Sequence, residues 1–489
     1  MTLAHAVVFG YLALVLTLGV VAGRRGAGGV ADFVAGDRAF GPVLMYFVMG
    51  ATIFSAYALL GTPQRVVAKG SDAFYILAYG AVGFVPVYFF GARVRRLGAK
   101  LEAVTQAELI GRRFDSRFVW GLMGAATVLA FVPYLVIQLK GAGMVMAAVT
   151  GWDPTVGAGV VYGVVTVYVV LGGVRGVGWT NVVQGIAMLI VVWGLGLWIP
   201  HALYGGVPEM FDRVVAERPD TLVLPGPGPT TDGQYTAEIL VSILGFSMWP
   251  QVFMKCFTAR SSRLVQLSAV LYPTFLFFLV PLLFIGYAAV LEGGPADDTV
   301  LLWMLDRPAL GGVGPAAFAF VAFAILAASM STGDALLHAG GSIFVRDVLV
   351  GGFGCALDER TQTMTMRACI VILGVVAVLV LQVAGGTSVV DLLLLAYAIP
   401  IQFMPLVLTG LYWRRANTVA AAAGLSVGVT AVIGLFVLQK LSAQTYATLN
   451  PWDLQIGVIA GALNLATLGA VGMLSAPMDD AHLSEYELG

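Results

Sequence analysis

The stretch Gly50–Pro63 reads G-A-T-I-F-S-A-Y-A-L-L-G-T-P, and the stretch Leu244–Pro250 reads L-G-F-S-M-W-P. Both place glycine, serine and proline within apolar runs where a plain membrane helix would have leucine or valine. Non-helical backbone at membrane depth is tolerated only where it lines a cavity or is buried in protein. Two such interrupted spans at corresponding places indicate a midplane transport site. The alternative is that glycine and proline are simply frequent in membrane helices, and the 61 glycines of this chain leave it open.

The composition is that of a membrane protein. Of the 489 residues, 59% are hydrophobic and 11% are charged, whereas soluble proteins carry about 25% charged residues. Apolar runs of about 20 residues, long enough to cross a ~30 Å hydrocarbon core, recur from end to end. We therefore predict an all-α integral membrane protein that forms a single membrane domain over residues 1–489. The 13 predicted spans cover residues 4–22, 41–62, 73–91, 118–149, 156–172, 181–200, 236–254, 266–292, 313–335, 368–386, 391–412, 417–438 and 453–474.

The basic residues orient these spans. With the N-terminus outside, the predicted inner segments hold 19 Lys and Arg residues, Lys255 among them, and the outer segments hold 6. Cytoplasmic loops of membrane proteins carry such an excess. We therefore predict a multi-pass protein of the bacterial inner membrane, with its N-terminus outside and its C-terminus in the cytoplasm. The acidic tail, residues 475–489, is expected to be a solvated and disordered cytoplasmic end.

A run in the ninth span has the chemistry of a sodium site. It reads A-A-S-M-S-T-G-D, and Ala328, Ser331 and Thr332 stand at i, i+3 and i+4, on one helix face. Hard cations prefer oxygen ligands, and a carbonyl and two hydroxyls point the same way here, opposite the carbonyls that a broken span would free. The alternative is that small residues let the helices pack closely.

Four motifs resemble those of one family, the sodium:solute symporters, over about Asp32 to Arg415. They are F-V-A-G-D-R-A-F-G (Phe33–Gly41), V-T-Q-A-E-L-I-G-R-R-F (Val104–Phe114), L-G-G-V-R-G-V-G-W-T-N-V-V-Q-G (Leu171–Gly185) and A-A-S-M-S-T-G-D-A-L-L (Ala327–Leu337). The resemblance implies a leucine-transporter-type core of two inverted five-helix repeats, at about residues 41–200 and 236–412. One helix precedes this core and two follow it.

The resemblance also implies site residues. The sodium ligands would be the carbonyls of Ala51, Phe54 and Ala328 and the hydroxyls of Ser331 and Thr332. The substrate cavity would be lined by Ser55, Tyr57, Phe246, Ser247, Trp249, Gln251 and Gln402. Two of these have a structural alternative: Trp249 as a packed aromatic side chain, and Gln402 as a satisfied polar group beside Pro400.

One position departs from the family pattern. Where many members have Asp after W-T, this chain has Asn181, and Asp334 lies three residues beyond Ser331. Some members are thought to hold a second sodium with that missing carboxylate. Asn181 and Asp334 therefore mark a possible second ion or proton site, and one sodium per cycle is the preferred expectation.

The substrate is less well defined. Lys140 is the basic residue predicted to lie within a span, and an intramembrane ionisable residue is a functional candidate. If it faces the cavity, an anionic substrate is favoured; the alternative is that it snorkels to the outer surface. The stretches Pro133–Gln138 and Gly245–Arg260 also resemble the monocarboxylate branch of the family.

The prediction is thus a secondary transporter that couples Na⁺ to uptake of a small monocarboxylate or amino acid. The alternatives are proton coupling, or sodium symport of a sugar, pantothenate or another neutral solute. An enzyme is not expected, because the chain has no phosphate loop, zinc motif or nucleophile elbow. The expected partners are the lipid bilayer and the small-molecule substrate, with no nucleic acid and no obligate protein partner.

Overall fold

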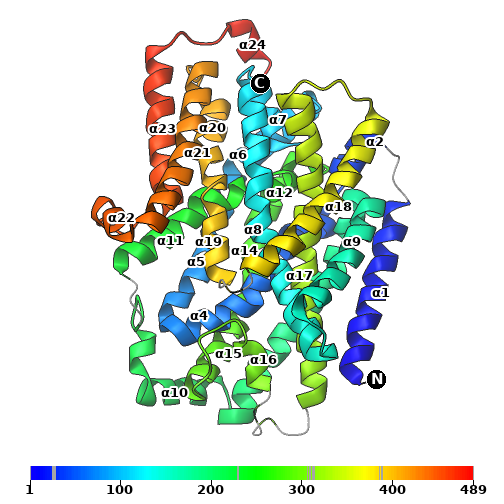
Figure 1. Cartoon of the computed structure of the whole chain (residues 1–489), viewed down its shortest axis with the longest axis vertical. Coiled ribbons are helices and arrows are strands. Elements are labelled where there is room, and N and C mark those ends of the chain that lie inside the picture. Colours follow the sequence, from blue (N-terminus) through cyan, green and yellow to red (C-terminus); the bar gives the residue numbers. More distant parts are fainter. Residues whose placement is uncertain are drawn as a thin grey trace.

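The protein is a bundle of long helices. The computed structural model describes residues 2–24, 29–227, 231–305, 307, 310, 314–384, 386 and 389–487, and every regular element in them is helical. The helices run between two ends of the molecule, with the N-terminus near one end and the C-terminus near the other (Figure 1). This placement of the termini fits an odd number of membrane crossings.

The longer helices of the first half are α1 (Leu3–Gly23), α3 (Pro42–Ala51), α5 (Tyr75–Gly83), α6 (Val85–Lys100), α7 (Gln106–Arg113), α8 (Arg117–Thr150) and α9 (Pro154–Tyr204). Those of the second half are α10 (Val207–Glu217), α11 (Asp232–Gly245), α14 (Ser262–Phe275), α15 (Leu279–Leu291), α17 (Gly314–Ile343), α18 (Glu359–Ala384), α19 (Val389–Tyr397), α20 (Phe403–Tyr412), α21 (Thr418–Leu441) and α23 (Ile456–Leu474).

The number of crossings follows from how these helices bend. Among the described residues, nine helices are long and apolar enough to cross a membrane, or ten if the bent pair Asp232–Met248 and Pro250–Thr258 is one span. Tyr57–Lys100 and Pro154–Tyr204, with 44 and 51 residues, are too long for one crossing. Gly70 and Gly173, with φ of 58° and 53°, divide them. With these two divided and 389–412 counted as one crossing, the described helices give the 13 predicted crossings.

Both expected breaks are present. In the first, α3 ends at Ala51, residues 52–55 are non-helical, and a π-helical turn η2 (Tyr57–Gly61) leads into α4 (Thr62–Lys69). In the second, a 3₁₀ turn η5 (Phe246–Met248) separates α11 from α12 (Pro250–Phe253) and α13 (Lys255–Thr258), with a bend of 49°. Pro250 explains the second break, because it has no N–H and disfavours helical backbone at the residue before it.

Packing places one long helix against the first break. α17 packs against α8, α9 and α1, and it also contacts α3 and η2 on either side of that break. α21 and α23 pack on each other at one side of the bundle, as two helices added after the core (Figure 1). α17 therefore lies where the predicted sodium ligands of two distant segments could meet.

The C-terminal tail is docked on the protein, so the expectation of a solvated and disordered end is wrong for residues 475–487. This segment contains α24 (Asp480–Ser484), and the side chains of Leu483 and Tyr486 are buried. Burial raises the pKa of the Tyr486 hydroxyl to about 12, so the packed ring stays neutral. The tail is acidic, but it also carries apolar side chains that pack between helix ends.

Basic residues at the helix ends hold this tail. Lys100 Nζ donates to the carbonyl of Glu485 at 2.6 Å, and Arg93 Nη2 donates to the carbonyl of Tyr486 at 3.3 Å. Arg414 pairs with Asp480 at 2.9 Å and also with Glu487. The basic residues that indicate a cytoplasmic face thus also bind the acidic tail.

Replacing the buried ring should release the tail. We expect Tyr486→Ala to lower the melting temperature of the purified protein by roughly 2 °C or more and to speed digestion of the tail by carboxypeptidase. Tyr486→Phe is the matched control, because it keeps the packed ring. Equal digestion rates for wild type and Tyr486→Ala would contradict the docked arrangement.

Candidate functional site

The predicted sodium ligands of two helices come together at the first break. The Ser331 hydroxyl on α17 lies 3.0 Å from the carbonyl oxygen of Ala51, where α3 ends, and 3.0 Å from that of Ala328. All three residues are fully buried. A carbonyl freed by the break therefore meets a carbonyl and a hydroxyl from α17 without any fixed charge between them.

The two remaining predicted ligands flank this point. The Thr332 hydroxyl is buried and has no hydrogen-bond partner among the described residues. Phe54 lies within the non-helical residues, and its ring stacks on that of Phe275, with centroids 5.1 Å apart. A buried hydroxyl without a partner is costly, so a cation bound beside Thr332 would satisfy it. Neutral oxygens of this kind suit a hard monovalent cation.

α8 stabilises the other side of the break. The side-chain oxygen of Gln138 accepts a hydrogen bond from the backbone N–H of Ala56 at 3.0 Å, and the Ser55 hydroxyl accepts one from the N–H of Tyr57 at 3.2 Å. Ser329 on α17 donates to the carbonyl of Gln138 at 2.7 Å. Gln138 was not among the predicted site residues; its signal in the sequence is an amide side chain within a predicted membrane span.

The second break presents polar atoms without partners. Among the described residues, the indole nitrogen of Trp249, the hydroxyl of Ser247 and the side-chain oxygen of Gln251 are buried and make no hydrogen bond. The Trp249 ring packs against Tyr134 and Tyr397, with centroids 4.9 Å and 5.3 Å apart. Trp249 is therefore a packed aromatic side chain, as the alternative proposed, but one whose polar atom is still available to a ligand.

The other aromatic residues of the predicted cavity are buried nearby. Phe246 packs against Phe84 and Tyr272, with centroids 5.3 Å and 5.9 Å apart. The hydroxyl of Tyr57 contacts that of Tyr75, and the Arg65 guanidinium lies 4.6 Å from the Tyr75 ring centroid. Phe246 and Tyr57 are thus both buried among other aromatic side chains.

Gln402 and Lys140 are engaged elsewhere. The Gln402 amide donates to the carbonyls of Ala398 and Gly457, at 3.0 Å and 3.2 Å. The Asn464 amide on α23 donates to the Gln402 backbone carbonyl at 2.8 Å and to its side-chain oxygen at 3.4 Å. Both polar atoms of the Gln402 side chain are thus used within the protein. Lys140 forms an ion pair with Asp298 at 2.7 Å, with 16% of its side chain exposed. Asp298 belongs to the connecting segment that follows α15, so the Lys140 charge is paired with that segment. This position is closer to the snorkelling alternative than to a cavity-facing one.

The two residues of the possible second site lie on different helices, Asp334 on α17 and Asn181 on α9. Asp334 on α17 accepts hydrogen bonds through Oδ2 from the Tyr168 hydroxyl at 2.7 Å and the Thr180 hydroxyl at 3.2 Å. Its other oxygen, Oδ1, has no partner among the described residues. Neither polar atom of the Asn181 side chain has one there either. Asp334 and Asn181 are both fully buried.

Lys255 is a further buried charge. It was predicted to lie in the inner segments, but it begins α13 and is only 4% exposed. The sequence contains a signal for this burial: Lys255 lies within the apolar run Q-V-F-M-K-C-F, four residues after Gln251.

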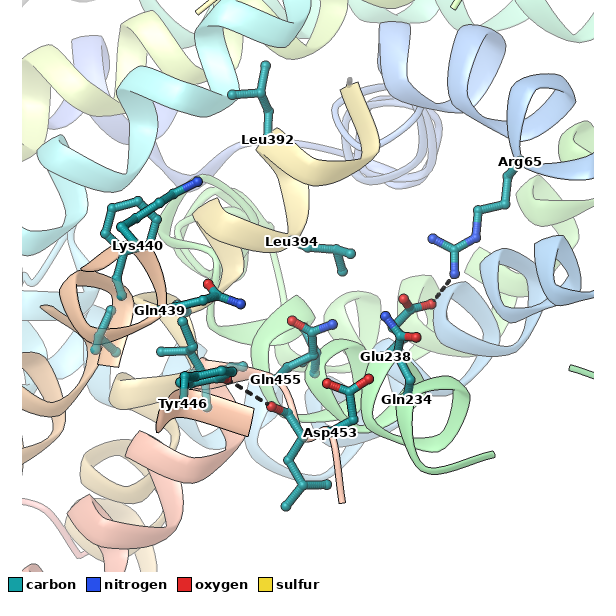
Figure 2. Close-up of a pocket in the computed structure, with 18 of the residues that line it drawn as sticks. Arg65, Gln234, Glu238, Leu392, Leu394, Gln439, Lys440, Tyr446, Asp453 and Gln455 are labelled. Atoms are coloured by element: carbon teal, nitrogen blue, oxygen red, sulfur yellow. Dashed lines mark hydrogen bonds and ion pairs between the residues drawn. The ribbon is translucent and has the colours of Figure 1, made fainter. Parts of the chain in front are cut away.

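A lined cavity lies apart from these residues. It measures about 490 Å³ and opens between α4, α11, α19, α21 and α23 (Figure 2). Arg65 at its edge pairs with Glu238, as the figure shows, and with Asp72 at 2.5 Å. No residue predicted to bind substrate is among its lining residues.

Known proteins resemble this chain over almost its whole length. The profile of the sodium:solute symporter family matches residues 33–428. An uncharacterised symporter of Bacillus subtilis strain 168, YhjB, is 27% identical, with 97% of this chain and 98% of the relative aligned. A monocarboxylate transport permease protein of Rhizobium johnstonii is 25% identical, with 96% of each aligned.

A solved structure shares the fold. A Na⁺-coupled sialic acid symporter, in a substrate-bound outward-open state, superposes with a TM-score of 0.81 at 19% identity, covering 97% of this chain and 98% of its own. The predicted leucine-transporter-type fold is thereby confirmed.

Proposed function

Because this chain belongs to the sodium:solute symporter family and is a secondary transporter, we propose that it couples sodium to the uptake of a small carboxylate or amino acid. The observation that carries the proposal is the meeting of Ala51, Ala328 and Ser331 at the first break. The substrate moves inward by alternating access, and sodium binds where the broken span meets α17.

The sodium site supplies the coupling. A ligand shifts a conformational equilibrium only through different affinities for the two states. The carbonyl of Ala51 belongs to the first repeat, whereas Ala328 and Ser331 belong to the second. A cation bound between them stabilises the conformation in which the two repeats meet. The unpartnered Thr332 hydroxyl supports the same position, because it is a buried oxygen that a cation would satisfy.

The second break suits a small polar substrate. The Ser247 hydroxyl and the Trp249 N–H are hydrogen-bond donors without a partner among the described residues, and a carboxylate accepts from such donors. The likeness to a monocarboxylate transport permease supports the same class. Lys140 is not needed for it, because its charge already pairs with Asp298.

Removing one sodium ligand should weaken coupling without unfolding the protein. Thr332→Ala takes away one of about five oxygens and leaves the packing nearly unchanged. We expect it to raise the sodium concentration for half-maximal uptake severalfold in proteoliposomes. Ser331→Ala should act likewise, and the double variant should lose sodium dependence. Thr127→Ala, which removes a buried hydroxyl bound to the carbonyl of Met123, is the control. Wild-type uptake that ignores sodium and follows a pH gradient would replace sodium by proton coupling.

The substrate prediction can be tested at Trp249. Trp249→Phe keeps an aromatic ring among Tyr134 and Tyr397 but removes the N–H. We expect it to weaken carboxylate binding several-fold, measured by thermal shift with and without sodium, while sodium binding stays near the wild-type value. Trp179→Phe, at an indole that is 50% exposed on α9, is the control. Unchanged binding of carboxylates and amino acids would remove Trp249 from the substrate site.

The orientation rests on the basic residues. We propose that the N-terminus lies outside and that the end carrying the docked tail faces the cytoplasm. A reporter fused after Arg263 or after Arg415 should therefore read cytoplasmic, and one placed at Pro225 should read outside. Opposite readings would invert every loop assignment.

A further inference from the structure

One face of α8 runs between the two broken spans. Residues at steps of three or four share one side of a helix, and four buried residues of α8 follow one another at such steps: Phe131, Tyr134, Gln138 and Gly141. We call these four residues the bridging face, because its two ends contact different breaks.

The first end of the bridging face packs on the second break. The ring centroids of Phe131 and Tyr134 lie 6.2 Å and 4.9 Å from that of Trp249. Trp249 is the residue at which the second broken span bends, between the helical segments that end at Met248 and begin at Pro250. A shift of α8 therefore moves two of the rings against which the Trp249 indole is packed.

The other end of the bridging face lies against the first break. The side-chain oxygen of Gln138 accepts a hydrogen bond at 3.0 Å from the N–H of Ala56, the residue that begins the helical turns after the break. A Cβ atom at Gly141 would lie 2.6 Å from the Cβ of Ala56, whereas carbon atoms in contact are ~3.5–4.0 Å apart. Glycine thus allows α8 to approach Ala56, and the hydrogen bond fixes the two helices to each other there.

Gln138 also connects the bridging face to α17. Its backbone carbonyl accepts a hydrogen bond from the Ser329 hydroxyl at 2.7 Å, and Ser329 precedes the proposed sodium ligand Ser331 by two residues. Its side-chain nitrogen donates to the carbonyl of Tyr134 at 3.2 Å, so the amide oxygen is the atom that faces Ala56. Because Gln138 is fully buried, its polar atoms depend on these partners within the protein.

We propose that Gln138 is a positioning residue that transmits sodium binding at the first break to Trp249 at the second. This deepens the proposed function and rests on it, because sodium is the coupling ion and Trp249 is the proposed substrate residue. The inference concerns how one site acts on the other. Such a link requires a contiguous set of contacts and a measured coupling between the sites.

The contacts define the route. A cation bound where α17 meets the first break draws these two segments together. Ser329 moves with α17 and Ala56 moves with the first broken span, and Gln138 is bonded to both of them. α8 therefore follows the movement, and Tyr134 on its bridging face shifts against the Trp249 indole. The indole N–H, which has no partner among the described residues, is thereby placed for the substrate when sodium is bound.

The test uses sodium alone and detects Trp249 by its fluorescence. Equilibrium ²²Na⁺ binding gives the concentration that saturates each purified variant, and emission spectra are compared at that concentration in sodium and in choline. The Trp249 signal is the part of the sodium-induced change that is lost when Trp249→Phe is added to the same variant. We expect this signal in wild type. Gln138→Met should lose it while still binding ²²Na⁺, because methionine has a similar length but no acceptor for the N–H of Ala56.

Two further variants separate positioning from loss of packing. Gln138→Glu keeps a side-chain oxygen on a chain of the same length, so it should retain the Trp249 signal. Gln184→Met is the matched control, because it removes a buried amide that donates to the Tyr11 hydroxyl on α1. It should also retain the signal.

Ser329→Ala decides the question if Gln138→Met does not fold or does not bind sodium. It removes the hydroxyl that bonds to the Gln138 carbonyl and should also lose the signal. Ser342→Ala is its control, because the buried Ser342 hydroxyl bonds to the carbonyl of His338 within α17. A signal of wild-type size in Ser329→Ala, or a wild type that binds ²²Na⁺ without a Trp249 signal, would overturn the proposal. Wild type that binds no ²²Na⁺ would instead refute the proposed function, so the two failures are distinguishable.

Discussion

Backbone groups freed inside the membrane must find partners within the protein, and the rest of this structure depends on how that is done at the first break. Water is absent from the hydrocarbon core, so each unsatisfied N–H or C=O costs several kcal/mol. Here the carbonyl of Ala51 meets the Ser331 hydroxyl, and the N–H of Ala56 donates to the Gln138 side chain. Two helices, α17 and α8, therefore satisfy the two sides of the break.

This arrangement links stability to transport. The Ser331 hydroxyl, which donates to the Ala51 carbonyl, is also one of the proposed sodium ligands. The same carbonyl would therefore contact the protein through Ser331 and the bound ion. Gln138 is in turn held by Ser329, two residues before Ser331 on the same helix. Sodium at this point would act on α3, α8 and α17 together. A small ion can thereby bias the relative positions of helices that belong to different repeats.

The sequence was sufficient for the fold and for the residues that meet at the first break. Apolar length, the positive charges and the interrupted runs are local features, whereas the inverted-repeat fold and the position of Ala51 at the break came from the resemblance to the sodium:solute symporters. The partner that a side chain contacts across the bundle, in contrast, depends on residues far away in the sequence. Gln402 was expected in the cavity, but its amide is used by α23, a helix more than fifty residues away in the chain. Lys255 was predicted to lie in an inner segment, because the sequence does not show how many residues after the helix break remain buried.

The tail was misjudged for a related reason. Its acidic composition indicates solvation when it is considered alone, but the same basic residues that mark the inner face offer it partners. Arg93, Lys100 and Arg414 each contact it, and the Tyr486 side chain is buried. The charge pattern of the helix ends therefore did not predict which charges would meet.

Buried charged residues of this protein differ in whether they form direct ion pairs. Arg65, Lys140 and Arg175 each form direct ion pairs, with Asp72, Asp298 and Asp32 at 2.5, 2.7 and 2.7 Å. Such contacts fix neighbouring segments to one another. Lys255 and Asp334 are more deeply buried than the pair at Lys140, and among the described residues neither forms an ion pair within 4.0 Å. The buried charges that join segments of the scaffold are therefore paired directly, whereas these two are not.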